Sequence, residues 1–560
     1  MTTLTAVLDR WAADRPDDVV AEEGDGRRRT LTAGRLAADT PRRAAALAAA
    51  GAGPDRAVVA WLPNRIEYLE TLAAASAVAA PVVGLNTRYR SDELTHILAR
   101  SRAAVLVTVD GFAGTDFSAV AAAATLPDDL TVVVVTDPPG PDAADPAGPG
   151  PVGRVRAVPA GWRSLGVAVR SWEELGRGDP GPVGGGTPPS EADLLIGFTT
   201  SGTTGRPKIA VHDHGGTIIH ARADADAYRF GAGDRLLLDL PLCGTFGFSA
   251  LMAAVAARAT TRIHQRFVAE ATADALSAGG VTHYFAADDM LLRIFATGRL
   301  RAGERLAWRE GAFANFVNAG PVVARRAEDE LGVRLSGVYG MSEVFALVTR
   351  WPSGMDVGLR SRPGGVPVDP TMEVRVVDPE TGIDLGTGVD GELCFRGRQV
   401  FTRYLGDPDA TARAFTPDGW FRSGDLGRLT GDGGFEFLAR LGDSLRLRGF
   451  LVDPAEIEQR LERHPAVELA QVVGAEVPDR GQVAVAFVRL ADPSGDPTVT
   501  EADLIAHCAA GIADLKVPAR VITVDEFPSV DGPNGRKILK RELRARAADE
   551  VAGPLPTRPG

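Results

Sequence analysis

Apolar strands alternate with amphipathic helices through the first 135 residues, and this alternation constrains the fold more than any other feature of the sequence. A continuous β-branched run near the end of this region predicts a buried strand at 131–136. The expected helix–strand pairs are 42–50 with 57–62, 67–79 with 82–85, and 91–100 with 103–109. We therefore expect a parallel α/β sheet in this part of the chain.

The rest of the chain divides into four stretches by composition. Residues 137–190 are broken by Pro and Gly and are expected to form surface loops around a short helix. A second α/β stretch is expected at 193–345, a strand-rich stretch at 371–440, and a last unit from about residue 441. Because 560 residues exceed what one ordinary core accommodates, we expect at least two domains.

Charge and apolar patterning argue against several classes of protein. A formal net charge of −12 disfavours nucleic acid as a partner. The longest apolar run, 71–85, is too short for a membrane span and contains Pro81. Asp9 and Arg10 stand where a signal peptide would need its apolar core, and the three cysteines are too scattered for a disulfide framework or a zinc site. We expect a cytoplasmic protein with neither membrane nor nucleic acid as a partner.

Lysine is scarce, which makes each lysine informative. Of 61 basic residues only four are lysines: Lys208, Lys516, Lys537 and Lys540. Arg replaces Lys at little cost on an exposed surface, but it fails where a compact ammonium must fit one position. The remaining lysines are therefore candidates for chemistry, and the alternative is chance survival of surface lysines.

A loop rich in Gly, Ser and Thr follows an expected strand at 194–198 and ends in Lys208. Gly202 and Gly205 allow the backbone N–H groups to face an anion, and four neighbouring hydroxyl residues add donors. The loop is not the common GxxxxGK[ST] P-loop, because no Gly-Lys-Ser/Thr follows. The sequence predicts a phosphate-binding loop here, with a flexible linker as the alternative.

At these residues the chain resembles the adenylate-forming superfamily, which includes acyl-CoA synthetases, luciferases and the adenylation domains of peptide synthetases. The resemblance covers nearly the whole chain and implies an α/β fold. Residues 1–440 would form a large N-terminal domain of two α/β subdomains and a β-subdomain, and 441–560 a small, mobile C-terminal α+β domain. Besides the loop, it rests on YGMSE at 339–343, GEL at 391–393, GWFRSGD at 419–425, Arg440, RGF at 448–450 and NGRKI at 534–538.

Adenylate formation explains why these residue types are needed. A carboxylate attacks the α-phosphorus of ATP, so Mg²⁺, ammonium groups and backbone donors must offset the repulsion between two anions. The resemblance implies that Lys537 bridges the substrate carboxylate and the α-phosphate, and that Lys208 and Glu343 complete the catalytic set. Glu343 would help to bind Mg²⁺, with the Thr203 or Thr204 hydroxyl nearby. The implied nucleotide-binding residues are Thr200, Ser201, Gly202, Thr203, Thr204, Gly205, Asn318, Ala319, Gly320, Tyr339, Gly340, Ser342, Asp425 and Arg440.

Single residues of this set have simpler alternatives. By the resemblance, Asp425 accepts hydrogen bonds from both ribose hydroxyls, and Tyr339 lies against the adenine. Taken alone, Asp425 could be a turn acid after Gly424, and Glu343 a solvated residue at a helix start. Lys516 is expected to be structural, and Lys540 to lie on a helix surface.

The sequence departs from the family pattern at several positions. Gly244 replaces the His or bulky residue that borders the acyl pocket, whose other expected residues are Phe246, Ala286 and Ala287. Because these positions leave room, we expect a bulky acid. Ile209 follows Lys208 where Gly is common, the adenine-side segment at 318–321 reads Asn-Ala-Gly-Pro, and the hinge residue is Gly442. Arg536 precedes Lys537, so both cations are candidates for the site, and the following residues favour Lys537.

The resemblance implies a two-step acyl-CoA ligase with ATP, Mg²⁺ and coenzyme A. The C-terminal domain would swing about Gly442, inserting Lys537 for adenylation and then presenting Arg448, Gly449 and Phe450 to the pantetheine of CoA. One alternative is a ligase specialised for the thioester step, fed with acyl-adenylate by a partner ligase. Another is a non-catalytic nucleotide-binding relative. Amino-acid activation is disfavoured, because 241–250 contains no Asp to bind an α-ammonium.

Overall fold

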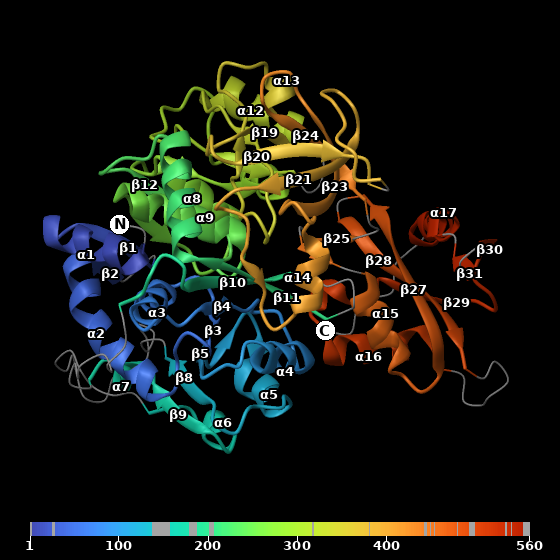
Figure 1. Ribbon diagram of the computed structural model, residues 1–560, viewed down its shortest axis with the longest axis horizontal. Coiled ribbons are helices and arrows are strands. Elements are labelled where there is room, and N and C mark those ends of the chain that lie inside the picture. The colour runs from blue at the N-terminus through green and yellow to red at the C-terminus, as the bar shows by residue number, and fades with distance from the viewer. Residues whose placement is uncertain are drawn as a thin grey trace. The chain divides into compact units, whose positions relative to one another are not determined.

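The chain folds into two compact units (Figure 1). The larger unit comprises Met1–Thr87, Ile97–Thr199 and Ile209–Ala439, and the smaller unit comprises Arg88–His96, Thr200–Lys208 and Arg440–Gly560. The computed structural model describes residues 3–24, 29–136, 157–177, 188–200, 206–315, 319–379, 381–441, 445–448, 450–452, 454–478, 480–491, 499–532, 535–538 and 540–552.

An eight-stranded sheet confirms the α/β alternation predicted for the first 135 residues. The pairs β10–β4, β4–β3, β3–β5, β5–β8 and β8–β9 are parallel, and β11 pairs antiparallel with β22. The strands are, in sheet order, β22 (Arg403–Tyr404), β11 (Lys208–Asp213), β10 (Leu194–Thr200), β4 (Val82–Gly84), β3 (Val58–Trp61), β5 (Val105–Val109), β8 (Thr131–Val135) and β9 (Ala168–Ser171).

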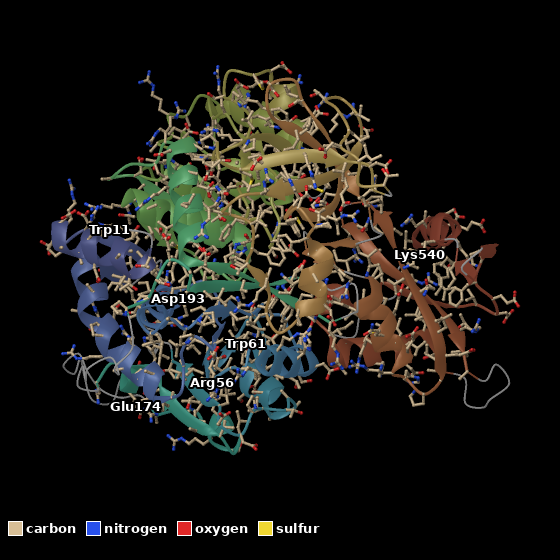
Figure 2. All side chains as sticks on the ribbon, in the orientation of Figure 1. Trp11, Arg56, Trp61, Glu174, Asp193 and Lys540 are labelled. Carbon is tan, nitrogen blue, oxygen red and sulfur yellow. The ribbon has the colours of Figure 1, made fainter. Side chains whose placement is uncertain are left out.

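Helices α1 (Leu4–Asp14), α2 (Ala33–Ala49), α3 (Ile66–Ala77), α4 (Ser91–Arg100) and α5 (Phe117–Ala122) connect the first strands. Nearly every residue of α3 is buried, including Glu67, whose carboxylate pairs with Arg65 and Arg29. Trp61 on β3, which is labelled in Figure 2, stacks on Phe117 of α5 with ring centroids 4.1 Å apart, so the sheet and this helix share one core.

Strand β9 corrects the expectation of loops around a single short helix at 137–190. The described part, 157–177, contains two short helices, α6 (Ala160–Arg163) and α7 (Trp172–Leu175), with β9 between them. Residues 137–156 and 178–187 lie outside the described residues. The four-residue strand escaped detection because its backbone is satisfied by parallel pairing with β8, which leaves little pattern in its own sequence.

A five-stranded sheet joins the N-terminus to the middle of the chain. Strand β1 pairs parallel with β13, and β12 pairs parallel with both β13 and β14, while β2 pairs antiparallel with β1. The strands are, in order, β14 (His283–Tyr284), β12 (Arg235–Leu238), β13 (Thr260–Ile263), β1 (Val19–Glu23) and β2 (Arg29–Thr32).

Five helices and a small parallel sheet complete the predicted second α/β stretch. The sheet is formed by β15 (Ala286–Ala287), β16 (Ala312–Ala314) and β17 (Ser336–Gly337). The helices are α8 (His214–Ala227), α9 (Thr245–Ala257), α10 (Ala269–Ser277), α11 (Asp288–Ala296) and α12 (Gly320–Leu331).

The strand-rich stretch forms a six-stranded sheet, and the four strand pairs whose register is described are antiparallel. Phe395, Phe421 and Phe435 of this sheet share one buried cluster with Tyr339, so the sheet also forms one side of the site described below. Two helices, α13 (Val357–Arg360) and α14 (Pro408–Ala414), accompany it. In order, the strands are β18 (Thr349–Arg350), β19 (Gly364–Pro367), β24 (Phe435–Arg440), β23 (Phe421–Leu429), β21 (Gly391–Arg396) and β20 (Glu373–Val377).

The smaller unit is α+β. Phe487 in its central sheet packs with Leu543 and Ala547 of the last helix in a separate core. Its strands are β25 (Leu445–Leu447), β26 (Phe450–Val452), β27 (Val467–Val477), β28 (Gly481–Leu490), β29 (Arg520–Thr523), β30 (Ser529–Gly532) and β31 (Gly535–Ile538). Its helices are α15 (Pro454–Glu462), α16 (Glu501–Gly511), the 3₁₀ helix η1 (Asp514–Lys516) and α17 (Lys540–Val551). The two units together confirm the predicted fold class, and no described helix is long and apolar enough to cross a membrane.

Lys516 is buried inside the smaller unit between two carboxylates. Its Nζ lies 2.8 Å from Glu93 Oε1, contacts Glu456 Oε2, and lies 5.0 Å from the centroid of the Tyr89 ring. Burial alone would lower the pKa of this ammonium, but Glu93 and Glu456 outweigh it and hold the pKa well above its ordinary value. A compact ammonium between two acids explains why this lysine is structural, as the sequence suggested.

We expect Lys516→Met to destabilise the smaller unit by about 3–5 kcal/mol, because two buried carboxylates would lose their common cation. Hydrogen–deuterium exchange of α15 and η1 measures this as a lowered free energy of opening. Lys540→Met is the matched control, since Lys540 on α17 is partly exposed and lies 3.1 Å from Glu458 (Figure 2). Losing that pair should cost less than about 1 kcal/mol. Equal effects of the two substitutions would contradict the structural role of Lys516.

Candidate functional site

A tight turn at 341–347 carries Glu343 in the larger unit. Met341 N–H donates to the Phe345 carbonyl at 3.0 Å, and Val344 N–H donates to the Met341 carbonyl at 3.2 Å. Phe345 and Leu347 have φ of +67° and +62°, a conformation that side-chain-bearing residues rarely adopt. A Cβ on Gly340 would lie 2.4 Å from Ala346 Cα, so only glycine allows the turn to close this tightly.

Glu343 is a buried, hydrogen-bonded carboxylate rather than a solvated residue at a helix start. Its Oε1 accepts a hydrogen bond from the Tyr404 hydroxyl at 2.7 Å. Its backbone carbonyl accepts from the Phe401 N–H, also at 2.7 Å. Strand β22 and the loop before it therefore fix the position of this carboxylate, while Ser342 lies half-buried beside it.

Glu343 fits the predicted role in binding Mg²⁺ together with a nucleotide. Carboxylate oxygen is a ligand that Mg²⁺ prefers, and this ion commonly takes only one or two carboxylates besides waters and phosphate oxygens. Among the described residues no group of three or more His, Cys, Asp or Glu side chains could hold a metal by itself. Thr203, the other predicted ligand, lies outside the described residues.

Tyr339 and Asp425 are brought together from positions 86 residues apart. The Tyr339 hydroxyl donates to Asp425 Oδ2 at 2.7 Å, and both side chains are buried. Asp425 lies inside β23, and its backbone N–H donates to Ser423 Oγ at 3.0 Å, so it is not a turn acid. The Tyr339 ring packs near Phe395, with centroids 5.5 Å apart. The result is an oriented carboxylate beside an aromatic wall.

The predicted adenine-side segment is held by two acceptors on its backbone. Asp288 Oδ2 accepts from the Ala319 N–H at 2.9 Å, and Asn315 Oδ1 accepts from the Gly320 N–H at 3.0 Å. Gly320 begins α12, and a Cβ there would lie 2.7 Å from the Ser361 carbonyl oxygen. Asn318 lies outside the described residues. Asp288 is fully buried, and the sequence alone did not identify it as the residue that holds this segment. It directly follows Ala286 and Ala287, which differ from the family pattern, and an acid at that place could have drawn attention to it.

The predicted acyl-pocket residues come from two elements of the larger unit. Ala286 and Ala287 form the short strand β15, and Phe246 lies on α9 with its ring centroid 6.4 Å from that of Phe285. Gly244 is the N-cap of α9. A Cβ on Gly244 would find its nearest atom, the Pro241 carbonyl oxygen, at 3.5 Å, which is an ordinary contact. The backbone around residue 244 therefore does not require glycine.

In the smaller unit, two described strand residues flank the predicted phosphate loop. Thr200 ends β10, and Lys208 begins β11; both are half-buried. His96 Nε2 lies 2.9 Å from the carbonyl oxygen of Pro207, next to Lys208. The predicted loop residues Ser201, Gly202, Thr203, Thr204 and Gly205 lie outside the described residues, and their role stays a prediction.

The remaining predicted residues belong to the smaller unit. Arg448 has φ of +49°, and its Nη1 lies 2.6 Å from Asp514 Oδ2. Phe450 pairs with Leu447 across the β25–β26 hairpin, and the backbone of Lys537 in β31 pairs with Val530 of β30. The side chains of Arg440, Phe450 and Lys537, and the whole of Gly442 and Gly449, lie outside the described part of the chain.

Two buried histidines contact the Glu343 turn and were also missed. His212 Nε2 lies 2.8 Å from the Ser342 carbonyl oxygen, and His220 Nε2 lies 2.8 Å from that of Ala346. Burial lowers the pKa of His212 to about 3, so its ring is neutral near pH 7. No local sequence pattern marks either residue, because their partners lie more than 120 positions away.

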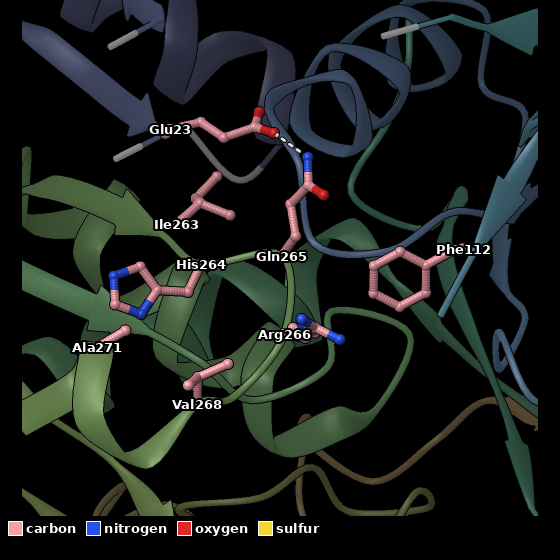
Figure 3. Close-up of a pocket in the computed structure, with 9 residues that line it drawn as sticks. Glu23, Phe112, Ile263, His264, Gln265, Arg266, Val268 and Ala271 are labelled. Carbon is pink, nitrogen blue, oxygen red and sulfur yellow. Dashed lines mark hydrogen bonds between the residues drawn. The ribbon is translucent and has the colours of Figure 1, made fainter. Parts of the chain in front are cut away.

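A cavity of about 300 Å³ opens elsewhere in the larger unit (Figure 3). Gln265 Nε2 donates to Glu23 Oε1 at 2.7 Å at its edge. None of the predicted site residues is among the residues that line it, so this cavity carries no part of the site. Its lining residues are Glu23, Gly24, Phe112, Ile263, His264, Gln265, Arg266, Val268 and Ala271.

Two family models match the chain. The model of the AMP-binding enzymes matches residues 8–405, and that of the AMP-binding enzyme C-terminal domain matches residues 456–536. Both matches include residues described above: the first covers the Glu343 turn and Tyr339, and the second covers Lys516.

Similar proteins extend over almost the whole chain. A feruloyl-CoA synthase from Amycolatopsis is 31% identical over 92% of this chain and 94% of its own. A 3-[(3aS,4S,7aS)-7a-methyl-1,5-dioxo-octahydro-1H-inden-4-yl]propanoyl:CoA ligase from Mycobacterium tuberculosis is 30% identical over 97% and 99%. A double mutant of o-succinylbenzoate CoA synthetase from Bacillus subtilis shares the fold, with a TM-score of 0.77, 23% identity, and coverage of 96% and 98%.

We expect Gly340→Ala to destabilise the larger unit by about 1–3 kcal/mol, because the added Cβ would overlap the backbone of Ala346 and force the turn open. Urea unfolding measured by tryptophan fluorescence checks the loss. Gly354→Ala is the matched control, since a Cβ at that position meets nothing within 4 Å. Comparable losses in the two variants would show that the close approach at Gly340 is not what the turn requires.

Proposed function

The chain belongs to the AMP-binding enzyme family, and from that premise we propose that it is an ATP-dependent acid–CoA ligase that works through an acyl-adenylate. The observation that carries the proposal is the buried Tyr339–Asp425 pair beside the fixed Glu343 turn. These are the groups that the chemistry needs to hold a ribose and a metal-bound polyphosphate. The relatives that match almost the whole chain are named as CoA ligases, which supports the same reaction.

The reaction balances in two steps. A carboxylate oxygen of the acid attacks the α-phosphorus of ATP, forming an acyl–phosphate bond while the bond to the β-phosphate breaks and pyrophosphate leaves. The sulfur of CoA then attacks the acyl carbonyl carbon after losing its proton, and AMP leaves with the electrons of the broken C–O bond. The first step places a carboxylate at the α-phosphorus of a polyphosphate, whereas the second places a thiolate at the acyl carbonyl carbon, so the two steps need different groups.

Each residue takes a role that suits its chemistry. Asp425, oriented by Tyr339, accepts hydrogen bonds from the ribose hydroxyls. Glu343, with the Thr203 hydroxyl, would hold Mg²⁺, which supplies positive charge at the phosphates when bound. Lys208 contacts the phosphates, and Lys537 contacts the substrate carboxylate and the α-phosphate.

The division of labour follows the two steps. We propose that residues 1–440 bind acid and nucleotide and that 441–560 move about a hinge near Gly442. Lys537 serves the first step, and Arg448, Gly449 and Phe450 face CoA in the second. The reaction needs ATP and CoA, which favours the cytoplasm as its location.

The acid is proposed to be bulky. The local backbone would accept a side chain at residue 244, but glycine leaves that space empty. The side chains of Ala286 and Ala287 also occupy little volume. Two relatives that are 31% and 30% identical to this chain are named for ferulic acid and for a bicyclic propanoic acid, and both acids are far larger than acetate.

A panel of carboxylic acids tests the function directly. With ATP, MgCl₂ and CoA, the protein should release AMP and form the acyl-CoA, both detected by mass spectrometry, and omission of any one component should abolish the products. Nucleotide binding with no AMP release for any acid in the panel would favour the non-catalytic alternative.

The thioester-specialised alternative is weakened by one contact. A departure from the family pattern beside the phosphate loop, such as Ile209, would favour this alternative if it disturbed ATP binding, but the Ile209 side chain is fully buried and packs against Gly197 in the sheet. Pyrophosphate exchange with the true acid decides the question. Robust exchange supports both half-reactions, whereas turnover of synthetic adenylate without exchange would require a partner ligase.

We expect Lys537→Ala to lower adenylate formation by roughly 10²–10³-fold and to leave thioester formation from a supplied adenylate within a few fold, because only the first step needs that ammonium. Pyrophosphate exchange and single-turnover thioesterification measure the two steps separately. Lys540→Ala should change neither, and Arg536→Ala decides between the two neighbouring cations. Equal loss of both half-reactions in Lys537→Ala would refute the assigned role.

We expect Gly244→Phe to raise the apparent KM for large acids by roughly tenfold or more while changing that for small acids little, because the new ring occupies the acyl pocket. Steady-state kinetics with a graded series of acids checks this, with the small acids serving as the internal control. A wild-type preference for acetate or propionate would overturn the bulky-acid proposal.

A further inference from the structure

The turn at 341–347 contains backbone strain that its surroundings must offset. Phe345 and Leu347 both have positive φ without being glycine. The carbonyl groups of Ser342 and Ala346 are also turned toward the protein interior, where a carbonyl without a donor is costly. Whatever supplies those donors therefore also determines where Glu343 lies.

His212 supplies the first donor. It lies on β11, four residues after Lys208, and it is fully buried. Its Nε2 is 2.8 Å from the Ser342 carbonyl oxygen. Because a carbonyl oxygen only accepts, the hydrogen must be on Nε2, and this fixes the tautomer of the neutral ring.

His220 supplies the second donor from a different element. It lies on α8, and its Nε2 is 2.8 Å from the Ala346 carbonyl oxygen and 3.0 Å from Asp224 Oδ2. Both neighbours are acceptors, so Nε2 again carries the hydrogen. Asp224 is fully buried one helical turn further along α8.

Phe345 joins the two histidines. Its ring centroid lies 3.8 Å from that of His212 and 4.7 Å from that of His220, with the His220 ring nearly parallel. The residue with the strained backbone is thus held by packing on its ring and by hydrogen bonds to the carbonyl groups on either side of it in sequence. We call His212 and His220 the histidine clamp.

We propose that the histidine clamp is a positioning device for the nucleotide-activating step: it holds the turn so that Glu343 faces the metal-bound phosphates. This inference rests on the proposed function. Tyr404 and Phe401 hold Glu343 through its own oxygens, whereas the clamp holds the backbone before and after it. Because the clamp contacts the turn that carries Glu343, we expect its effect to fall on the step that uses ATP.

His212→Leu and His212→Gln test the proposal as a pair. Leucine fills the space without a donor, whereas the glutamine side-chain amide reproduces a donor near the position of Nε2. His214→Leu is the matched control: His214 is equally buried two residues away, accepts from the Leu4 N–H at 3.1 Å, and belongs to the start of α8.

The readouts are the KM for MgATP, pyrophosphate exchange and thioester formation from a synthetic acyl-adenylate. His212→Leu should lower exchange roughly ten- to hundredfold and raise the KM for MgATP, as expected for a carbonyl that loses its donor, while thioester formation stays within about threefold. His212→Gln should recover most of the exchange, and His214→Leu should keep both activities. If His212→Leu does not fold, His220→Leu and His220→Gln give the same comparison.

Equal loss of both half-reactions, no recovery with glutamine, or the same loss in His214→Leu would show a merely structural role and overturn the inference. An active wild-type enzyme with an unaffected His212→Leu variant would also overturn it and leave the proposed function intact. Absence of exchange in the wild-type protein with every acid would overturn the two-step function and the inference together.

Discussion

Three of the carboxylates that are buried in the larger unit belong to the predicted site or lie beside it, and each needs donors that the fold must supply, because a buried charge without donors is costly. Tyr404 donates to Glu343, Tyr339 donates to Asp425, and the Ala319 N–H donates to Asp288. Each donor comes from a part of the chain distant from its acceptor. Burying these acids therefore fixes the elements around them, and the site is organised before any substrate binds.

The Glu343 turn shows how far this organisation extends. Tyr404 of β22 donates to the Glu343 carboxylate, and histidines of β11 and α8 contact the carbonyl groups on either side of it. The turn can close tightly only because residue 340 is glycine. β11 is also the strand that begins at Lys208. β11 thus carries Lys208 of the predicted phosphate loop at its start, and through His212 it also supports the turn of Glu343, the predicted metal ligand.

The identity of the acid is a separate question from the reaction. Relatives at about 30% identity over almost the whole chain are named for quite different acids. In the predicted acyl pocket, Gly244 departs from the family pattern without any demand from the local backbone. At Lys516, by contrast, the surroundings do restrict the residue type, because two buried acids require a compact cation between them.

The helix–strand alternation of the first sheet, the two-part α/β organisation and the family motifs could all be predicted from the sequence. Periodicity and motif spacing are local properties of the chain, so they can be recognised without the fold. It missed β9, whose four residues acquire their pattern only by pairing with β8. It named Tyr339, Asp425 and Glu343 but not the contacts that bury them, and it named neither Asp288 nor the two histidines. These contacts, like the pairing of β1 with β13 some 240 residues away, became visible only in the tertiary structure. Contacts between residues so far apart depend on where whole elements pack, and that packing leaves no trace in the sequence near either partner.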